Sequence, residues 1–413
     1  MQGYRFRLSP KHTHLYHLNQ ALGANRYVWN KLLAMNLFRL ENKQPILWYN
    51  EMAWFITLWK QSDEYGFLNL APSQSLQQTA KSIDRAFKDA FDKNKPNKRI
   101  PKFKRLSRNE AGIKYPQGVL LDEGNSVIKL PKLGWVKYRN SRKTLGKIKN
   151  VTISRKAGNY TLSIQTEREV KEQLHQSSTA VGIDMGVAQF ATLSNGTVIA
   201  PKNSFKQLSE KLAKEQRKLK NKVKFSANWQ QQQAKVSKLH TTIANVRNDF
   251  LHQTSSTISK NHAMIVMEDL KVANMSKSSK GILEAPGKQV AQKSGLNRSI
   301  LDQGWGEFRR QLEYKQNWQG RLVLFVPAQY TSQTCSACGH VDKDSRMTQS
   351  EFFCTACGHE DNADINAAKN ILAKGHKLLS QDVKNRGTHG VSLRSEPQKR
   401  SATGTILAQR KAA

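Results

Sequence analysis

Two pairs of cysteines in the last quarter of the chain constrain its structure more than any other feature. They follow the spacing C-x2-C-x15-C-x2-C, and no other cysteine occurs in the 413 residues: Cys335, Cys338, Cys354 and Cys357. Four thiolates at such spacings can surround one Zn²⁺ as a closed tetrahedron, with no open position for a substrate. The pattern therefore predicts a structural zinc ribbon and a reducing compartment, because no cysteine is left for a disulfide framework.

A histidine follows each cysteine pair, at His340 and His359. Either imidazole could replace a thiolate as a zinc ligand, or both residues could support the thiolates from outside the coordination sphere. We expect the second arrangement, with four sulfur ligands.

The charge of the chain indicates a polyanionic partner. Lys and Arg number 67 against 31 Asp and Glu, which gives a formal net charge of +36. Self-repulsion of this size favours binding to nucleic acid. The sequence shows neither a basic amphipathic helix nor a long uncharged apolar segment, so we expect a cytoplasmic protein that does not enter a membrane.

The N-terminal half combines strand patterns with a long helical stretch. Residues 4–8 alternate apolar and basic side chains, which predicts a strand with a positive, solvated face. Short strand patterns separated by turns recur over residues 113–166, whereas residues 12–91 show helical spacing with a possible break at Gly23. We predict a small β-barrel that the first strand completes and that a helical domain interrupts.

A basic stretch at residues 93–108 carries two prolines and one phenylalanine among its lysines and arginines. Such a stretch is either a solvated loop or an arm that contacts phosphates while its aromatic ring meets the bases. The sequence leaves both interpretations open. The candidate nucleic-acid contacts of the N-terminal half are Arg5, Arg7, Lys102, Phe103, Lys104 and Arg105.

Three acidic residues stand at the ends of predicted core elements in the second half of the chain. Asp184 and Glu268 end apolar strand patterns, and Asp364 precedes a predicted helix at 365–373. Strands paired in one sheet would bring the first two acids about 5 Å apart, and a helix packed on the sheet could add the third. Three carboxylates in one cleft need a counter-charge, which two Mg²⁺ ions suited to phosphodiester hydrolysis would supply.

Each acid also has a structural alternative. An aspartate at a strand end is often a turn former or a helix cap, and Asp364 could cap the helix that begins at Ile365. Asp269 and Asp361 are neighbouring candidates for the same roles.

Four segments together resemble a known family: GIDMGV at 182–187, IVMEDL at 265–270, CSACG at 335–339 and CTACGHEDNADINAAKNI at 354–371. This arrangement resembles the TnpB (OrfB) proteins of bacterial insertion sequences, which are RNA-guided nucleases related to type V CRISPR effectors. Weaker similarity extends through residues 4–10, 82–87 and 101–104. The resemblance implies a RuvC-like nuclease core of RNase H fold, with an inserted zinc-binding module.

The resemblance also implies roles and partners. Asp184, Glu268 and Asp364 match the catalytic triad, and the four cysteines match the zinc site. The expected activity is Mg²⁺-dependent cleavage of double-stranded target DNA beside a short adjacent motif. A guide RNA from the transposon end would direct the cleavage, and we expect one protein chain per RNA, acting in the bacterial nucleoid.

The predicted fold is α/β and mixed, with several domains. In chain order they are a wedge-like barrel at 1–10 and 96–172, a helical recognition domain at 11–95, a linker at 173–180, a RuvC-like nuclease domain at 181–329 and 361–374, a zinc ribbon at 330–360 and a disordered basic tail at 375–413. Within the nuclease domain we expect a helical hairpin at 204–261, a mobile loop at 275–297 and one helix at 299–318.

Two other functions remain open. A cleavage-deficient, RNA-guided DNA-binding regulator would be favoured by the loss of one triad acid, and all three are present. A transposase or resolvase that acts without RNA would carry no defined transcript.

Overall fold

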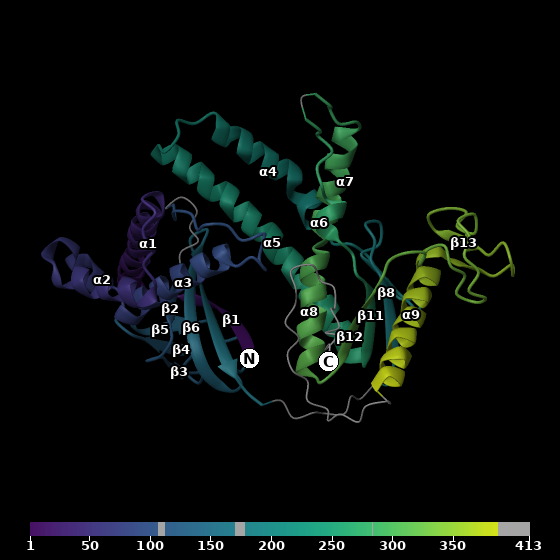
Figure 1. The fold of residues 1–413 in the computed structure, drawn as a ribbon, viewed down its shortest axis with the longest axis horizontal. Helices are drawn as coiled ribbons and strands as arrows, with labels where there is room; N and C mark the ends of the chain where they lie inside the picture. Colours follow the sequence, from purple (N-terminus) through teal and green to yellow (C-terminus); the bar gives the residue numbers. More distant parts are fainter. Residues whose placement is uncertain (106–111, 170–177, 283, 387–413) are drawn as a thin grey trace. The chain divides into compact units, whose positions relative to one another are not determined.

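The computed structural model describes residues 1–105, 112–169, 178–282 and 284–386 (Figure 1). Its contacts divide the chain into a first unit, Met1–Glu169, and a second unit that follows it. Every helix within the described ranges is too short or too polar to span a bilayer.

A seven-stranded antiparallel sheet organises the first unit, in the order β2-β6-β7-β1-β5-β4-β3. Its strands are β1 Gln2–Ser9, β2 Gly112–Tyr115, β3 Leu120–Asp122, β4 Val127–Leu130, β5 Gly134–Tyr138, β6 Lys147–Lys156 and β7 Asn159–Glu167. As predicted, the N-terminal strand joins the later strands, pairing with both β7 and β5. The predicted closed barrel differs from this arrangement, because no pairing between β2 and β3 closes the sheet in the described part of the unit.

The helices of this unit are α1 His12–Glu41, α2 Tyr49–Gln61, the 3₁₀ helix η1 Asp63–Leu70 and α3 Ser73–Phe91. Of these, α1 and α3 contact strand β2, and α2 and η1 pack on the other helices. Gly23 does not break α1, which is one continuous helix. A buried amide joins the helices, since Asn25 accepts a hydrogen bond from Thr79 at 2.7 Å and donates one to Ser75 at 2.7 Å. This polar contact fixes α1 against α3 inside an otherwise apolar core.

The second unit contains a five-stranded sheet in the order β10-β9-β8-β11-β12. Its strands are β8 Ala180–Asp184, β9 Ala191–Leu193, β10 Val198–Ile199, β11 Met264–Glu268 and β12 Leu322–Val326. The three strands β8, β11 and β12 are parallel, whereas β9 and β10 extend the sheet in antiparallel pairs. The carboxyl ends of β8 and β11 therefore lie at the same edge of the sheet.

Helices cover both faces of the five-stranded sheet (Figure 1). Helices α5 Ala227–Asn261 and α8 Trp305–Trp318 pack on one face, and α9 Ala363–Arg386 packs on the other. The remaining helices of the unit are α4 Ser204–Lys220, α6 Val272–Met275 and α7 Val290–Gln303. In β11, Ile265 and Met267 belong to the core formed with α5 and α8, and Val266 between them packs with Ile371 of α9. The near-continuous apolar run of β11 follows from this burial on both faces.

Three expectations for the second unit are wrong in their boundaries. The single helix expected at 299–318 is two helices, because Gly304 adopts φ +72° between α7 and α8. The expected loop at 275–297 contains the end of α6 and the first turns of α7. The tail expected to be disordered from Gly375 continues α9 as far as Arg386, and residues 387–413 lie outside the described residues.

Two glycines allow α9 to approach the sheet closely. A Cβ on Gly182 of β8 would lie 2.1 Å from the Ala368 carbonyl oxygen and 2.8 Å from the Leu372 amide nitrogen. A Cβ on Gly375 would lie 2.4 Å from a methyl group of Val266. The polar stretch after Gly375 continues α9 beyond this second contact with the sheet.

We expect Gly182→Ala to reduce the free energy of unfolding by about 3 kcal/mol, because the added methyl group must displace the α9 backbone. Urea unfolding followed by tryptophan fluorescence measures the change. Gly295→Ala is the matched control, since Gly295 lies in α7 with no atom near its Cβ position. The control should be neutral or stabilise by up to about 1 kcal/mol. Equal effects of the two substitutions would contradict the packing argument.

Candidate functional site

Three carboxylates converge at the carboxyl edge of the parallel strands. Asp184 is the last residue of β8 and Glu268 the last of β11, one position beyond the paired residues Ile183 and Met267. Neighbouring strands lie about 4.8 Å apart, so the two acids leave the sheet side by side. The third acid, Asp364, is the second residue of α9.

The contact of α9 with Gly182 explains how Asp364 reaches this edge. Ala368 lies directly over Gly182. Asp364 precedes Ala368 by four residues, about 6 Å along the helix axis. Asp184 follows Gly182 by two residues, about 6.6 Å along the strand. From the contact of Ala368 with Gly182, the helix reaches Asp364 and the strand reaches Asp184 over similar distances. Both acids therefore lie at the carboxyl edge of the sheet.

The pKa of Asp184 reflects the proximity of the other two acids. Burial, together with the negative charges of Glu268 and Asp364, raises the pKa of Asp184 to about 7. Burial also raises the pKa of Glu268, while a hydrogen bond from Thr331 opposes that rise. A carboxyl group with a raised pKa favours any cation that replaces its proton.

Groups from other segments hold the acids in place. The Thr331 hydroxyl donates to Glu268 Oε1 at 2.6 Å, and both residues are buried. The Arg346 guanidinium lies 3.4 Å from Asp364 Oδ1, and its charge lowers the pKa of Asp184. The positive charge of the Lys374 ammonium likewise lowers the pKa of Glu268. The sequence analysis missed these three residues, because a lone Arg, Lys or Thr carries no local signal.

The alternative roles considered for the acids fall to other residues. Asn362 Oδ1 accepts from the amides of Asp364 at 3.0 Å and Ile365 at 3.3 Å, so Asn362 caps α9. Asp269 forms an ion pair with Arg309, and Asp361 forms one with Lys369. The helix-cap interpretation of Asp364 is therefore wrong, and its carboxylate faces Asp184 and Arg346 instead.

The four cysteines gather as the sequence predicts. Their sulfur atoms all lie within 4.8 Å of one another, with Cys335 3.8 Å from Cys357 and Cys338 3.6 Å from Cys354. A tetrahedral site with Zn–S bonds of about 2.3 Å requires sulfur separations near these values. The residues present therefore fit one Zn²⁺.

Backbone hydrogen bonds shape both cysteine turns in the same way. The Cys335 amide donates to the His340 carbonyl at 2.8 Å, and the Cys354 amide donates to the His359 carbonyl at 2.9 Å. Gly339 and Gly358 adopt φ of +78° and +70° inside these turns. Hydrogen bonds from the amides of Cys357 and Ala356 lower the pKa of the Cys354 thiol to about 6, which favours the thiolate that a metal needs.

The cysteine module is attached to α9 by two asparagines. Asn366 donates to the Thr334 carbonyl at 2.8 Å and accepts from the Ser336 amide at 2.8 Å. Asn370 donates to the carbonyls of Thr331 at 3.0 Å and Thr334 at 2.6 Å. The module also contains Arg346 and the hairpin of β13 Glu351–Phe353 and β14 Glu360–Asn362. A metal ion bound by the module would thereby be coupled to the helix that carries Asp364.

The three carboxylates are less tightly gathered than the sulfur atoms. Among the described residues, the four cysteines form the group whose potential ligand atoms lie within 4.8 Å of one another, and the acids stand farther apart. Ionised carboxylates repel one another, and Arg346 offsets part of the charge at Asp364. A cation between the acids would remove the repulsion, so their charges fit Mg²⁺.

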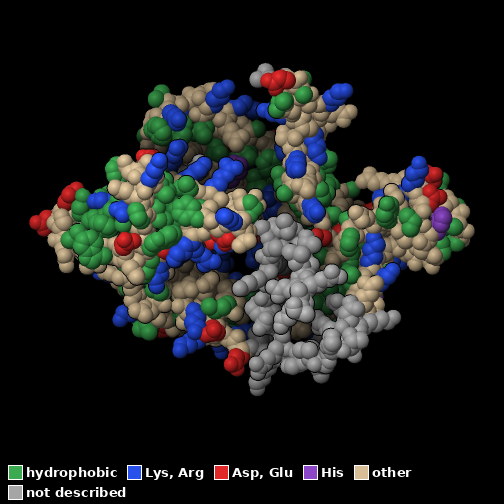
Figure 2. Space-filling view, in the orientation of Figure 1, with side chains coloured by type: hydrophobic (Ala, Val, Ile, Leu, Met, Phe, Trp, Pro, Cys, Tyr) green, Lys and Arg blue, Asp and Glu red, His purple; other side chains and the backbone are tan. Residues whose placement is uncertain are grey.

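The candidate nucleic-acid contacts lie in the first unit. Arg5 and Arg7 point to the exposed side of β1, opposite the buried Tyr4, Phe6 and Leu8. Residues 102–105 are exposed beside α1. Figure 2 shows that Lys and Arg side chains are spread over the visible face of both units. This distribution agrees with the net charge of the chain.

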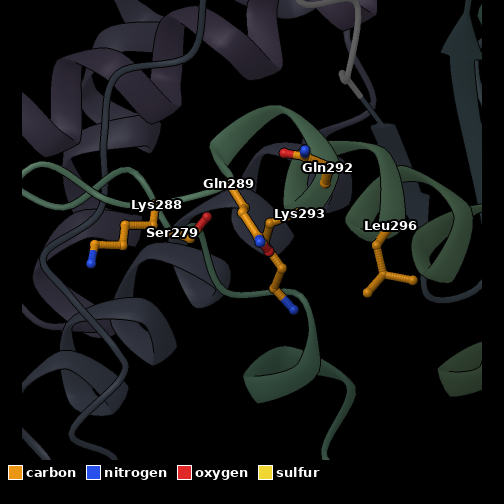
Figure 3. A pocket seen from close by; sticks show the side chains of 6 residues that line it. All are labelled: Ser279, Lys288, Gln289, Gln292, Lys293 and Leu296. Carbon is orange, nitrogen blue, oxygen red and sulfur yellow. The ribbon is translucent and has the colours of Figure 1, made fainter.

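A separate pocket of about 370 Å³ lies between α7 and the segment before it (Figure 3). It is lined by Ser279, Lys288, Gln289, Gln292, Lys293 and Leu296. The Lys293 ammonium already donates to the Met275 carbonyl at 2.8 Å. Because no lining residue is acidic, this pocket is not the candidate magnesium site.

Family models match three parts of the chain. The model described as "Probable transposase" (OrfB_IS605) matches residues 163–279, and "Cas12f1-like, TNB domain" matches residues 305–371. A "Helix-turn-helix domain" model (HTH_OrfB_IS605) matches residues 1–44, where the structure has β1 and the single helix α1.

Two relatives match nearly the whole chain. "Putative RNA-guided DNA endonuclease InsQ" of Escherichia coli (strain K12) is 50% identical over 380 residues, which cover 92% of this chain and 94% of the relative. A "Putative RNA-guided DNA endonuclease" of Streptomyces pristinaespiralis is 28% identical, with 97% of each chain covered.

Solved structures share the fold at low sequence identity. The structure described as "Cryo-EM structure of the Cas12f1-sgRNA-target DNA complex" matches with a TM-score of 0.53 and 15% identity, over 87% of this chain and 82% of the other. The fold is therefore that of the mixed α/β, multidomain proteins to which Cas12f1 belongs. From its identity to InsQ, the chain belongs to the OrfB (TnpB) family of insertion-sequence proteins.

Proposed function

We propose that this protein is an RNA-guided, Mg²⁺-dependent DNA endonuclease encoded by an insertion sequence. The observation that carries the proposal is the convergence of Asp184, Glu268 and Asp364 at one edge of the five-stranded sheet. The strand order and the position of α9 support the RuvC-like core that the family resemblance implies. The endonuclease names of the relatives support the same activity.

The three carboxylates have different proposed roles in the reaction. Asp184 and Asp364 are the proposed metal ligands, and Glu268, fixed by Thr331, orients the attacking water. Arg346 balances the charge of Asp364 before metal and substrate arrive. Bound Mg²⁺ would supply the positive charge that stabilises the phosphodiester transition state.

The first unit is the proposed holder of the nucleic acids. Its sheet would act as the wedge and its helices as the recognition domain, with Arg5 and Arg7 on the exposed face of β1 toward phosphates. Base pairing between guide RNA and target DNA would supply sequence specificity, while the protein reads a short adjacent motif. Nucleoid association and one chain per RNA are further parts of this proposal.

Sequencing the RNA that co-purifies with the protein tests this function. We expect one defined transcript from the transposon end, and a DNA matching its guide should be cut only when Mg²⁺ is present. A defined transcript with DNA binding but no cutting would favour the cleavage-deficient regulator. Cutting by protein that carries no defined transcript would favour the RNA-independent transposase or resolvase.

The raised pKa of Asp184 predicts a cost in stability for the metal-free protein. Because its pKa is about 7 in the folded state and 3.8 as its ordinary value, the folded protein binds more protons between these values. Its free energy of unfolding should therefore fall as pH rises through that window. We expect Asp184→Asn to be more stable than the wild type, with an advantage about 1–2 kcal/mol larger at pH 8 than at pH 5.

Urea unfolding in the presence of a chelator for Mg²⁺ measures this difference. Saturating Mg²⁺ is the control, since the ion stabilises the ionised wild-type site and should reduce the advantage of the variant. An advantage that is independent of pH would show that Asp184 does not titrate in this range.

A further inference from the structure

The exposed basic segment at residues 102–105 is held against α1 by consecutive side chains of that helix. The Asn30 carboxamide forms both backbone hydrogen bonds of Lys104: it donates to the carbonyl at 3.1 Å and accepts from the amide at 2.8 Å. The Trp29 indole donates to the Lys102 carbonyl at 3.1 Å. These three hydrogen bonds satisfy backbone groups of Lys102 and Lys104, as pairing with a neighbouring strand would. The segment itself belongs to no sheet.

A fourth contact fixes the Lys104 side chain. Its ammonium lies 3.8 Å from the centre of the Trp29 ring, a cation–π distance. Desolvation and the charge of Lys114 lower the pKa of Lys104 to about 8. The Lys104 ammonium is thus engaged by the Trp29 ring, which makes it a poorer phosphate contact than its neighbours Lys102 and Arg105.

Phe103 lies between the two residues whose backbone is held. Its side chain is 52% exposed. Burial of this half-exposed ring contributes little stabilisation. Packing of Phe103 therefore does not explain why three hydrogen bonds hold the backbone of its neighbours. The flanking side chains of Lys102 and Arg105 are also exposed and carry positive charge. An exposed ring on a backbone held at both flanking residues, with basic neighbours, is complementary to a nucleobase with its phosphates.

We propose that Phe103 is a stacking platform for a base of single-stranded nucleic acid, and that Trp29 and Asn30 are positioning residues that hold it ready. Lys102 and Arg105 contact the adjoining phosphates. This inference rests on the proposed function, because it assigns a place on the first unit to the guide RNA or to an unpaired strand of the target DNA. Preorganisation reduces the ordering cost of binding, so the clamp raises affinity without touching the ligand.

The test uses the full-length protein, freed of co-purified RNA, and short oligonucleotides that carry one 2-aminopurine. Parallel titrations with single-stranded RNA and single-stranded DNA distinguish the two sources of the base. Stacking on Phe103 should quench the fluorescence of the probe. We expect Phe103→Ala to abolish this quenching and to weaken binding about 5- to 100-fold, whereas Phe103→Trp should retain both.

The dependence of binding on salt separates the ring from the charges. Phe103→Ala should leave the slope of log K against log salt unchanged, while Lys102→Ala should reduce it by about 0.7. Phe38→Ala is the matched control, because Phe38 is 63% exposed on the same helix α1 and has no such clamp. An equal loss of binding in Phe38→Ala would overturn the assignment to Phe103.

A double-mutant cycle tests the clamp. Asn30→Ala should weaken binding in the wild-type background and have little effect once Phe103→Ala is present, because it acts through the ring. Additive effects would overturn the positioning role. Unchanged binding by Phe103→Ala, in a protein that still cuts guided DNA, would overturn the inference and leave the proposed function standing. Wild-type protein that binds neither oligonucleotide would overturn both.

Discussion

Asp184→Asn is expected to reduce cleavage of guided target DNA by about a thousandfold or more, while binding of the guide RNA is retained. The side chain keeps its size and loses the charge that the cation needs. Asp184 is the most central acid of the three, since both other carboxylates raise its pKa. Loss of one metal ligand removes several kcal/mol of transition-state stabilisation, and each 1.4 kcal/mol corresponds to a tenfold change in rate.

Single-turnover cleavage at saturating guide RNA measures this loss, with filter binding as the check on RNA affinity. Asp269→Asn is the matched control, because Asp269 follows Glu268 directly yet pairs with Arg309. The control should remain within a few fold of the wild type. Wild-type cleavage by Asp184→Asn, or a complete loss in Asp269→Asn, would show that the carboxylates have been assigned wrongly.

Cys354→Ser is expected to remove the bound zinc and to reduce cleavage at least a hundredfold. Cys354 is fully buried beside Cys338, and a serine hydroxyl is a poor replacement for a thiolate ligand. Structural zinc sites contribute about 10–16 kcal/mol of apparent binding free energy, so the module should lose its fold without metal. The loss should reach the active site, because the module carries Arg346 and holds α9 through Asn366.

Zinc content by atomic emission and cleavage rate are measured on the same preparation. We expect close to one zinc per wild-type chain and none in the variant. RNA binding should persist, because the sheet and helices of the first unit have their own core. Ser336→Ala is the control inside the module, since only the backbone of Ser336 is used in its contact with Asn366. A variant that lacks zinc but cuts normally would separate the module from catalysis.

Local patterns in the sequence were sufficient where the structure depends on neighbours along the chain. The cysteine spacing predicts the four-sulfur group because each turn is closed by bonds within six residues. The acids that end apolar runs predict strand ends at Asp184 and Glu268. In each case burial on both faces leaves a signal in the sequence.

Contacts between segments that are far apart in the chain leave no comparable pattern in the sequence. The stretch from Gly375 to Arg386 is polar and resembles a disordered tail, yet it continues α9, which packs on Val266 at Gly375. Arg346 and Thr331 reach the acids from the cysteine module, and Asn30 reaches the basic arm from α1. Single polar residues of this kind have no periodicity, so no pattern distinguishes them from solvated surface.

The sequence by itself determined the four cysteines that fit a zinc ion, the strands that end in acids and the basic character that favours a nucleic-acid partner. The tertiary structure alone decided which acids face one another, which residues balance their charge and which ring of the basic arm is held outward. The physical reason is the separation along the chain of the residues that interact. Spacing, hydrophobic period and net charge are properties of the chain, whereas a charge balance or a hydrogen-bonded clamp exists only after folding has brought separate segments together.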